Sequence, residues 1–293
     1  MKKTKIVTSS IWKSPVAAAE VLGRYEELVA AWPLPAETRG LPTRAGDTFV
    51  IVWGAESGPP LVLLHGTGSN SAMWMGDVAR YGKNHRVYAI DIPGEPGKSE
   101  DRRMDIQGEA HAVWLEEVLD GLGLGSVRLV GLSLGGWIAL SFAVTRPARV
   151  NKLGLLCPPG LAPTRGSFLV RAIALSFLGK KGMELISRSL YGNRVPPPGA
   201  LEFGTLMASS YKPRMDRPRL FSDAELAKLT MPVFLVFGGR DLLLRSREGA
   251  DRLARLVPHS RVLFDEGAGH ALIDFGGQVA EFLEEPGAGT RGC

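Results

Sequence analysis

Apolar residues along this chain follow two patterns, a helical spacing in the longer segments and unbroken runs in the shorter ones. Residues 14–31 have the helical spacing and end at Trp32-Pro33, which predicts a first helix. The short runs are typical of strands that are covered on both faces. We predict strands at residues 48–53, 61–64, 86–90, 127–130, 152–157, 233–237 and 261–264.

Helical patterns recur between these strands. They predict helices at residues 71–82, 105–122, 134–145, 245–256 and 271–284. Because strands and helices alternate, the sequence predicts an α/β protein with a mainly parallel, doubly wound sheet and helices on both of its faces.

The alternation stops between residues 158 and 230, where helical segments occur without a strong strand. We interpret this segment as a helical cap inserted into the sheet domain. The predicted parts are an N-terminal helical extension, a core in two pieces, the cap and a flexible tail, at residues 1–47, 48–157 with 231–285, 158–230 and 286–293.

One stretch of the cap, residues 168–178, is apolar on nearly every side of its predicted helix. Such a helix is either buried between cap and core or lines a pocket for a lipophilic substrate, and both interpretations stay open here. The stretch is too short to be a membrane anchor.

The net charge and the cysteine content limit the classes of function that the chain can have. The net charge is +5, from 35 Lys and Arg against 30 Asp and Glu, but the basic residues are scattered along the sequence, which favours a solvated surface over nucleic-acid binding. Cys157 and Cys293 do not form a disulfide framework, and Cys157 is expected to be a small core residue. No apolar segment of membrane-spanning length follows the basic start or occurs later. We therefore expect a cytoplasmic protein.

Catalytic groups are expected where strands end, because ligands of open parallel sheets bind at the carboxyl ends of the strands. The segment 131–135, Gly-Leu-Ser-Leu-Gly, joins a predicted strand to a predicted helix, and its two glycines permit a sharp turn that exposes the Ser133 hydroxyl. Asp241 follows the strand at 233–237, and His270 follows the last predicted strand. A nucleophile, a carboxylate and an imidazole therefore lie on one edge of the sheet, in one of the known orders of a serine triad.

Two other acids compete with Asp241 as the triad carboxylate. Asp265 and Glu266 are nearer to His270 in sequence, but they precede a turn and are expected to face solvent. The strand at 152–157 is followed only by Pro158-Pro159-Gly160. We therefore assign the carboxylate to Asp241.

These motifs resemble those of the α/β-hydrolase superfamily over residues 48–283. They are His-Gly-Thr-Gly at 65–68, Gly-Leu-Ser-Leu-Gly-Gly at 131–136, Gly-Gly-Arg-Asp at 238–241 and Gly-Ala-Gly-His at 267–270. The lengthened loop at 91–99, Asp-Ile-Pro-Gly-Glu-Pro-Gly-Lys-Ser, and Phe-Ser-Asp-Ala-Glu-Leu at 221–226 resemble the bacterial carboxylesterases that cleave bulky arylpropionate esters. The resemblance implies a serine hydrolase.

The expected roles are those of a serine triad with an oxyanion hole. Ser133 attacks an acyl carbonyl, His270 takes its proton and later delivers it to the leaving alcohol, and Asp241 orients the imidazole. The backbone N–H groups of Thr67 and Leu134 are the expected oxyanion donors.

The remaining histidines carry no predicted chemistry. His65 is expected to brace its own loop. His85, His111 and His259 have no ligand spacing with each other or with cysteine, so no metal site is predicted. No dinucleotide or phosphate fingerprint occurs, and no cofactor is expected.

The leading hypothesis is a serine carboxylesterase that forms an acyl-enzyme on Ser133 and cleaves an ester of a lipophilic or aryl small molecule. The same triad could hydrolyse a carbon–carbon bond, a lactone, an amide or a thioester. An alternative of another class is a receptor that binds a small molecule without turnover. The expected partner is thus a small-molecule ester, with no nucleic acid and no membrane span.

Overall fold

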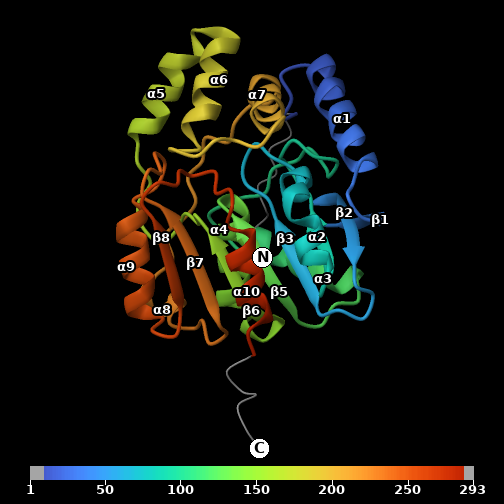
Figure 1. Ribbon diagram of the computed structural model, residues 1–293, viewed down its shortest axis with the longest axis vertical. Coiled ribbons are helices and arrows are strands. Elements are labelled where there is room, and N and C mark those ends of the chain that lie inside the picture. Colours follow the sequence, from blue (N-terminus) through green and yellow to red (C-terminus); the bar gives the residue numbers. More distant parts are fainter. Residues whose placement is uncertain (1–9, 287–293) are drawn as a thin grey trace, which may run out of the picture.

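The short apolar runs form one eight-stranded sheet in the computed structural model, which describes residues 10–286 (Figure 1). The strands are β1 (Ala36–Thr43), β2 (Gly46–Gly54), β3 (Pro60–Leu64), β4 (Arg86–Ile90), β5 (Val127–Leu132), β6 (Val150–Leu156), β7 (Val233–Gly238) and β8 (Arg261–Asp265). Their order across the sheet is β1-β2-β4-β3-β5-β6-β7-β8. β2 is antiparallel to both of its neighbours, and all pairs from β4 to β8 are parallel. The predicted α/β fold is confirmed.

Helices lie on both faces of this sheet and above one of its ends. They are α1 (Pro15–Ala30), α2 (Val78–Gly82), α3 (Ala110–Gly121), α4 (Leu134–Thr145), α5 (Ser167–Ser176), α6 (Gly179–Ser189), α7 (Ala200–Ser210), α8 (Asp223–Leu226), α9 (Ser246–Leu256) and α10 (Gly276–Glu284), with 3₁₀ turns at Ser71–Asp77 and Pro147–Arg149. No helix within residues 10–286 is both long enough and apolar enough to span a bilayer.

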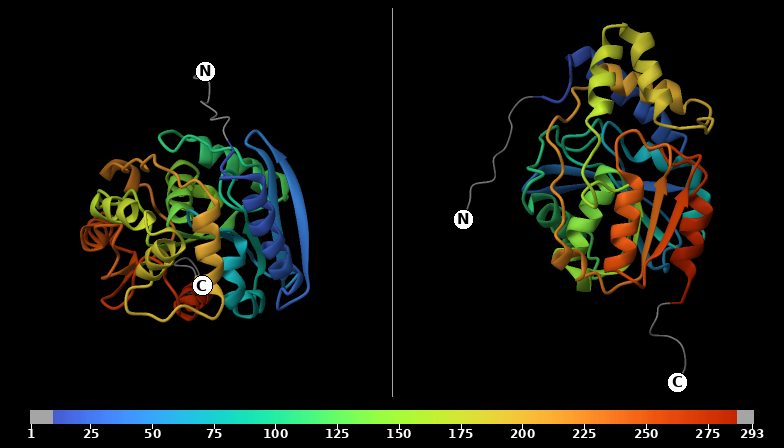
Figure 2. Two further views of the ribbon diagram at one scale, coloured as in Figure 1. Left: turned by 90° about the horizontal axis from the view of Figure 1, so that it is seen from above. Right: turned by 90° about the vertical axis from the view of Figure 1, so that its left-hand side faces the viewer.

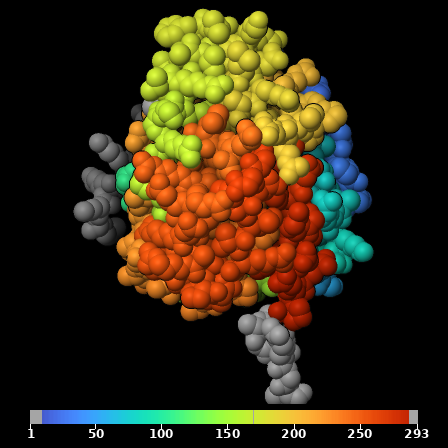
Figure 3. Space-filling model, turned by 60° about the vertical axis from the view of Figure 1, so that its left-hand side comes forward, coloured from blue at the N-terminus to red at the C-terminus, as the bar shows by residue number. Residues whose placement is uncertain are grey.

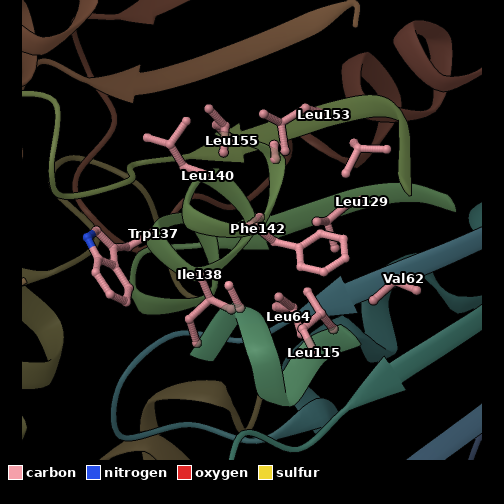
Figure 4. Packing of buried hydrophobic residues seen from close by; sticks show 14 of the residues in the cluster. Val62, Leu64, Leu115, Leu129, Trp137, Ile138, Leu140, Phe142, Leu153 and Leu155 are labelled. Atoms are coloured by element: carbon pink, nitrogen blue, oxygen red, sulfur yellow. The ribbon is translucent and has the colours of Figure 1, made fainter. Parts of the chain in front are cut away.

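Alternating side chains of the strands supply two separate apolar cores. On β3, Val62 and Leu64 pack with residues of α3, α4 and α9, whereas Leu61 and Leu63 pack with residues of α1, α2 and α10. Figure 4 shows the first of these cores, with Phe142 of α4 beside the strand residues. All of these side chains are fully buried, and each contributes about 1.5–3 kcal/mol to stability. The sheet is therefore a rigid base for the loops at its carboxyl edge.

The edge strand β1 was absent from the sequence prediction. Its residues are mostly exposed and it contains Pro42, so the segment lacks an apolar pattern that would indicate a strand. It pairs with β2 along its whole length. The sheet therefore begins at Ala36, within the segment that was predicted to be a helical extension.

Two predicted helices begin later than the sequence suggested. α3 starts at Ala110 and not at residue 105, because the Asp105 carboxylate accepts a hydrogen bond from the Gln107 amide (2.9 Å) and forms a turn there. α10 starts at Gly276 and not at residue 271, because the Ala271 amide donates to the Leu190 carbonyl of the cap (2.9 Å). The tail beyond Pro286 lies outside the described residues.

The segment between β6 and α8 forms a layer of helices, α5, α6 and α7, above the carboxyl ends of the parallel strands (Figures 1 and 2). One sequence interpretation is wrong here: the apolar stretch at 168–178 is not buried between cap and core. Val170, Ile173 and Phe177 are all exposed, because α5 packs chiefly against α6 and leaves its outer side uncovered.

Candidate active site

Ser133 lies at a strained turn between β5 and α4. Its backbone has φ 50° and ψ −114°, a conformation that L residues rarely adopt. The strand and helix pass so closely here that a Cβ on Gly131 would lie 2.2 Å from the Gly135 carbonyl oxygen. A Cβ on Gly135 would lie 2.3 Å from the Leu64 carbonyl oxygen. Both glycines are therefore required by the turn, as the sequence pattern indicated.

Three side chains from separate loops meet at this turn. The Ser133 hydroxyl lies 2.8 Å from Nε2 of His270, and Nδ1 of the same ring lies 2.7 Å from Oδ2 of Asp241. Asp241 and His270 are buried, while Ser133 is partly exposed. When Nδ1 carries the proton and donates it to Asp241, Nε2 is left as an acceptor for the serine proton.

Asp241 is held as a carboxylate despite its burial. Burial raises its pKa, but the adjacent His270, the hydrogen bond between them, and the Leu243 and Leu244 amides together hold the pKa below its ordinary value. The two amides donate to Oδ1 over 2.7 and 3.1 Å, so Oδ2 is left for the imidazole. The carboxylate thus has a fixed orientation toward the ring.

The two acids that compete with Asp241 for the role of triad carboxylate, Asp265 and Glu266, bond to other groups. Asp265 accepts hydrogen bonds from the Gly267 and Ala268 amides (2.8 and 2.9 Å) and pairs with Arg194 of the cap over 2.6 Å. Glu266 is exposed and pairs with Arg247. Asp265 is half-buried rather than solvent-facing as the sequence suggested, and its role is to shape the turn before His270.

The two expected oxyanion donors lie on either side of the serine. Gly66 packs so close that a Cβ on it would lie 3.5 Å from the Ser133 Cβ, which places the loop with Thr67 beside the turn. Leu134 is the first residue of α4. Within residues 10–286, neither the Thr67 nor the Leu134 N–H donates a hydrogen bond to another group of the protein. Both amides are therefore free to meet an oxyanion.

The profile of the family described as "Alpha/beta hydrolase family" matches residues 61–282. The chain belongs to the α/β-hydrolase family. Two Bacillus subtilis relatives are carboxylesterase YbfK, 31% identical over 85% of this chain and 86% of its own length, and "uncharacterized carboxylesterase nap", 30% identical over 85% of each chain.

Solved structures give the same result. The crystal structure of carboxylesterase CesB (YbfK) from B. subtilis superimposes with a TM-score of 0.82, at 27% identity, over 92% of this chain and 98% of that one. Naproxen esterase from B. subtilis superimposes with a TM-score of 0.79, at 27% identity, over 92% and 96% of the two chains. The predicted resemblance to bacterial carboxylesterases and the prediction of a hydrolase are confirmed.

Two loops of the hydrolase are held by buried polar side chains, one by His65, as the sequence suggested, and one by Asp91. Nδ1 of His65 lies 2.9 Å from the Gly66 carbonyl and Nε2 accepts from the Ile92 amide (2.9 Å), so both ring nitrogens are used to brace loops. Burial lowers the pKa of His65 and keeps the ring neutral. Asp91 accepts from the Ser71 and Lys98 amides (2.9 and 2.8 Å) and orders its own loop.

Sequence reasoning missed the position of Glu95. This fully buried carboxylate accepts hydrogen bonds from the Gly68 amide (2.7 Å) and from the Tyr211 hydroxyl (3.0 Å). It therefore joins the loop that carries Thr67 to the end of cap helix α7. Burial raises the pKa of Glu95, although the Gly68 amide and the nearby Arg214 oppose the rise. The signal in the sequence was a lone acidic side chain within the Pro- and Gly-rich part of the lengthened loop, at Pro93-Gly94-Glu95-Pro96-Gly97.

Cys157 is a buried core residue, as the sequence predicted, and it also lies against Asp241 and His270. Its sulfur and the acceptor atoms of Asp241 and His270 all lie within 4.8 Å of one another. Burial, followed by the charge of Asp241, raises the pKa of the thiol and keeps it protonated. Asp241 and His270 already hydrogen-bond each other, so these two side chains fit a Ser–His–Asp arrangement with a neighbouring thiol better than they fit a metal site with Cys157.

Proposed function

We propose that this α/β hydrolase cleaves a carboxylic ester through an acyl-enzyme on Ser133. The observation that carries the proposal is the continuous hydrogen-bonded chain from the Ser133 hydroxyl through His270 to Asp241. A serine hydroxyl is a weak nucleophile until a base is positioned to take its proton. Here Nε2 of His270 is at hydrogen-bond distance, with Asp241 behind it to stabilise the imidazolium.

The reaction proceeds in two halves. In the first, Oγ of Ser133 bonds to the ester carbonyl carbon while its proton moves to Nε2 of His270. The resulting oxyanion accepts hydrogen bonds from the Thr67 and Leu134 amides. Collapse breaks the bond to the alcohol oxygen, which leaves with the proton from Nε2. In the second half water attacks the acyl carbon, gives a proton to Nε2, and the carboxylic acid is released as the proton returns to Ser133.

We propose an aryl or otherwise lipophilic acyl group as the substrate class. The support comes from similarity to naproxen esterase and to the YbfK carboxylesterase. Among the described residues, a surface pocket is lined by Leu161, Phe221 and Arg252. None of its lining residues belongs to the triad, so we do not propose it as the acyl pocket.

The test is a set of initial rates on p-nitrophenyl esters of increasing acyl length and on the methyl ester of naproxen, for the natural protein and for Ser133→Ala. We expect turnover that rises with apolar acyl groups and disappears in the variant. Absence of turnover on every ester by folded protein, or equal rates for the variant, would refute the proposal. Faster turnover of a dienoic ring-fission compound than of any ester would indicate carbon–carbon hydrolysis.

A fluorophosphonate, which labels an activated serine covalently, helps to distinguish an esterase from a receptor without turnover. Labelling of Ser133 together with steady-state ester turnover supports the esterase. Labelling without any steady state on the full set of esters and lactones favours a receptor.

A further inference from the structure

The outer end of the cap carries Phe177, the most exposed large apolar side chain among the described residues, with further exposed apolar side chains on the same two helices. Phe177 is 85% exposed and Leu178 is 59% exposed, at the turn that joins α5 to α6. Val170 and Ile173 extend this surface along α5, and Leu185 extends it along α6, at 69%, 50% and 43% exposure. Figures 1 and 3 show these two helices projecting beyond the sheet domain. We call this surface the cap tip.

The cap tip is held in this form by backbone geometry. Gly179 has φ 57°, a left-handed conformation that reverses the chain directly after Leu178. Gly182 lets α6 approach α5 closely, since a Cβ there would lie 1.8 Å from the Leu175 carbonyl oxygen. The Phe177-Leu178 pair is thus presented by a closed helical hairpin.

Basic residues occur on the same helical hairpin as these apolar side chains. Between residues 165 and 190 the chain has one acidic residue, Glu184. The basic residues in that range are Arg165, Arg171, Lys180, Lys181 and Arg188, all of them exposed. None of the five forms an ion pair within residues 10–286, whereas arginines of the core such as Arg252 pair with acids. Two of the five, Lys180 and Lys181, follow the Phe177-Leu178 pair almost directly, so basic and exposed apolar side chains occur together at the cap tip.

The exposed apolar side chains and the basic residues together indicate which kind of partner fits the cap tip. Exposed contiguous apolar surface marks an interaction site. A second copy of the chain would bring two positive tips together, which like-charge repulsion opposes. An anionic lipid surface instead attracts the basic side chains and offers an apolar layer directly beneath its headgroups.

We propose that the cap tip docks on anionic lipid surfaces, with Phe177 and Leu178 inserted between headgroups and Lys180 and Lys181 against lipid phosphates. The binding is peripheral and needs no spanning helix. It does not require the triad, so Ser133→Ala binds as the natural protein does.

The test is flotation of the full chain with vesicles of phosphatidylcholine alone and of phosphatidylcholine mixed equally with phosphatidylglycerol. We expect recovery with the mixed vesicles at low salt, weaker recovery at high salt because salt screens the attraction, and little recovery with phosphatidylcholine alone. Lys180→Gln/Lys181→Gln should weaken partitioning to mixed vesicles about tenfold or more, because each substitution removes the electrostatic attraction of one lysine to the anionic headgroups. Phe177→Ser/Leu178→Ser should weaken it to a similar degree by removing the inserted groups.

Matched controls change the same residue types elsewhere on the surface. Lys83→Gln/Lys228→Gln removes the same charge from exposed sites away from the cap tip, and Met215→Ser/Leu220→Ser removes exposed apolar groups from the segment before α8. Both controls should bind as the natural protein does. Thermal unfolding of each variant verifies the fold.

Three results would overturn the proposal. The first is no flotation with mixed vesicles at low salt. The second is that the control pairs weaken partitioning to the vesicles equally, which would mean that net charge or non-specific hydrophobic adsorption drives binding. The third is a concentration-dependent dimer in sedimentation velocity, abolished by Phe177→Ser/Leu178→Ser in protein that does not float, which would assign the cap tip to a second copy.

Discussion

The carboxyl edge of the sheet and the cap above it are both rich in apolar residues, yet they differ in what surrounds those residues. At the sheet edge, β3, β5 and α4 are buried on all sides, and the strained Ser133 turn is held by contacts such as the Ser133 amide to the Leu156 carbonyl (2.8 Å). In the cap, α5 has one main neighbour and exposes much of its apolar surface. The first region is built to keep a geometry, and the second is free to present a surface. Strain of the kind stored at Ser133 persists only where the surroundings over-determine it.

The largest expected effect is at the sheet edge. Ser133→Ala should lower kcat for ester hydrolysis by about 10⁵-fold or more, because it removes the nucleophile of a triad that acts as a unit. Steady-state rates on a p-nitrophenyl ester measure it. Ser141→Ala is a matched control, since this buried hydroxyl of α4 has no hydrogen-bond partner among the described residues. A control variant that loses activity to the same degree would show that the loss reflects misfolding of α4 and not chemistry.

The next effect distinguishes the two nearby carboxylates. Asp241→Asn should lower kcat about 10⁴-fold, because an amide would no longer hold the productive imidazole tautomer. Asp265→Asn should lower kcat less than about tenfold, because Asp265 shapes the turn and does not touch the ring. Rates of both variants on one ester measure the difference. Equal losses would contradict the assignment of Asp241.

The difference between the two regions also explains what the sequence could predict. Runs such as Leu61–Leu64 have a pattern that burial on both faces requires, so strands and their following loops could be placed, and with them Ser133, Asp241 and His270. Propensity and periodicity carry no information about an edge strand with one partner, and β1 was missed for that reason. They also cannot say whether an apolar helix has a neighbour, and for that reason the sequence left a buried position of the 168–178 stretch open, which the exposure of α5 contradicts. The contact of Glu95 with Gly68 depends on two loops meeting in space, which no local pattern encodes.

A pair of phenylalanines tests the same difference through stability. Phe142→Ala in the core should lower the free energy of unfolding by about 3–5 kcal/mol, because it leaves a cavity among fully buried neighbours. Phe177→Ala on the cap tip should change it by about 0.5 kcal/mol or less. Denaturant unfolding of both variants gives the two values. A large loss at Phe177 would mean that the cap tip is covered in solution.

Glu95 connects the two regions, and its removal should affect catalysis through position. Glu95→Ala should lower kcat about 100-fold with little change in KM, because the Gly68 amide loses its acceptor and the Thr67 N–H shifts away from the oxyanion. Glu95→Gln retains an acceptor and should recover most of the rate. If Gln is as impaired as Ala, the charge of Glu95 and not its hydrogen bond is what matters.

The smallest expected effect is a pH dependence of stability from Asp241. Its pKa in the folded protein lies below the ordinary value of 3.8, so the ionised carboxylate contributes stability that is fully present above that pH. As the pH falls through the lower folded pKa, Asp241 becomes protonated and the contribution is lost. The melting temperature of the natural protein should therefore exceed that of Asp241→Asn by a few degrees near neutrality, since about 1 kcal/mol corresponds to 2–4 °C in a protein approaching this size. Thermal scans of both proteins across acidic pH measure the gap, which should narrow only below about pH 4. A gap that narrows between neutrality and pH 5 would mean that another group, and not the Asp241 carboxylate, sets it.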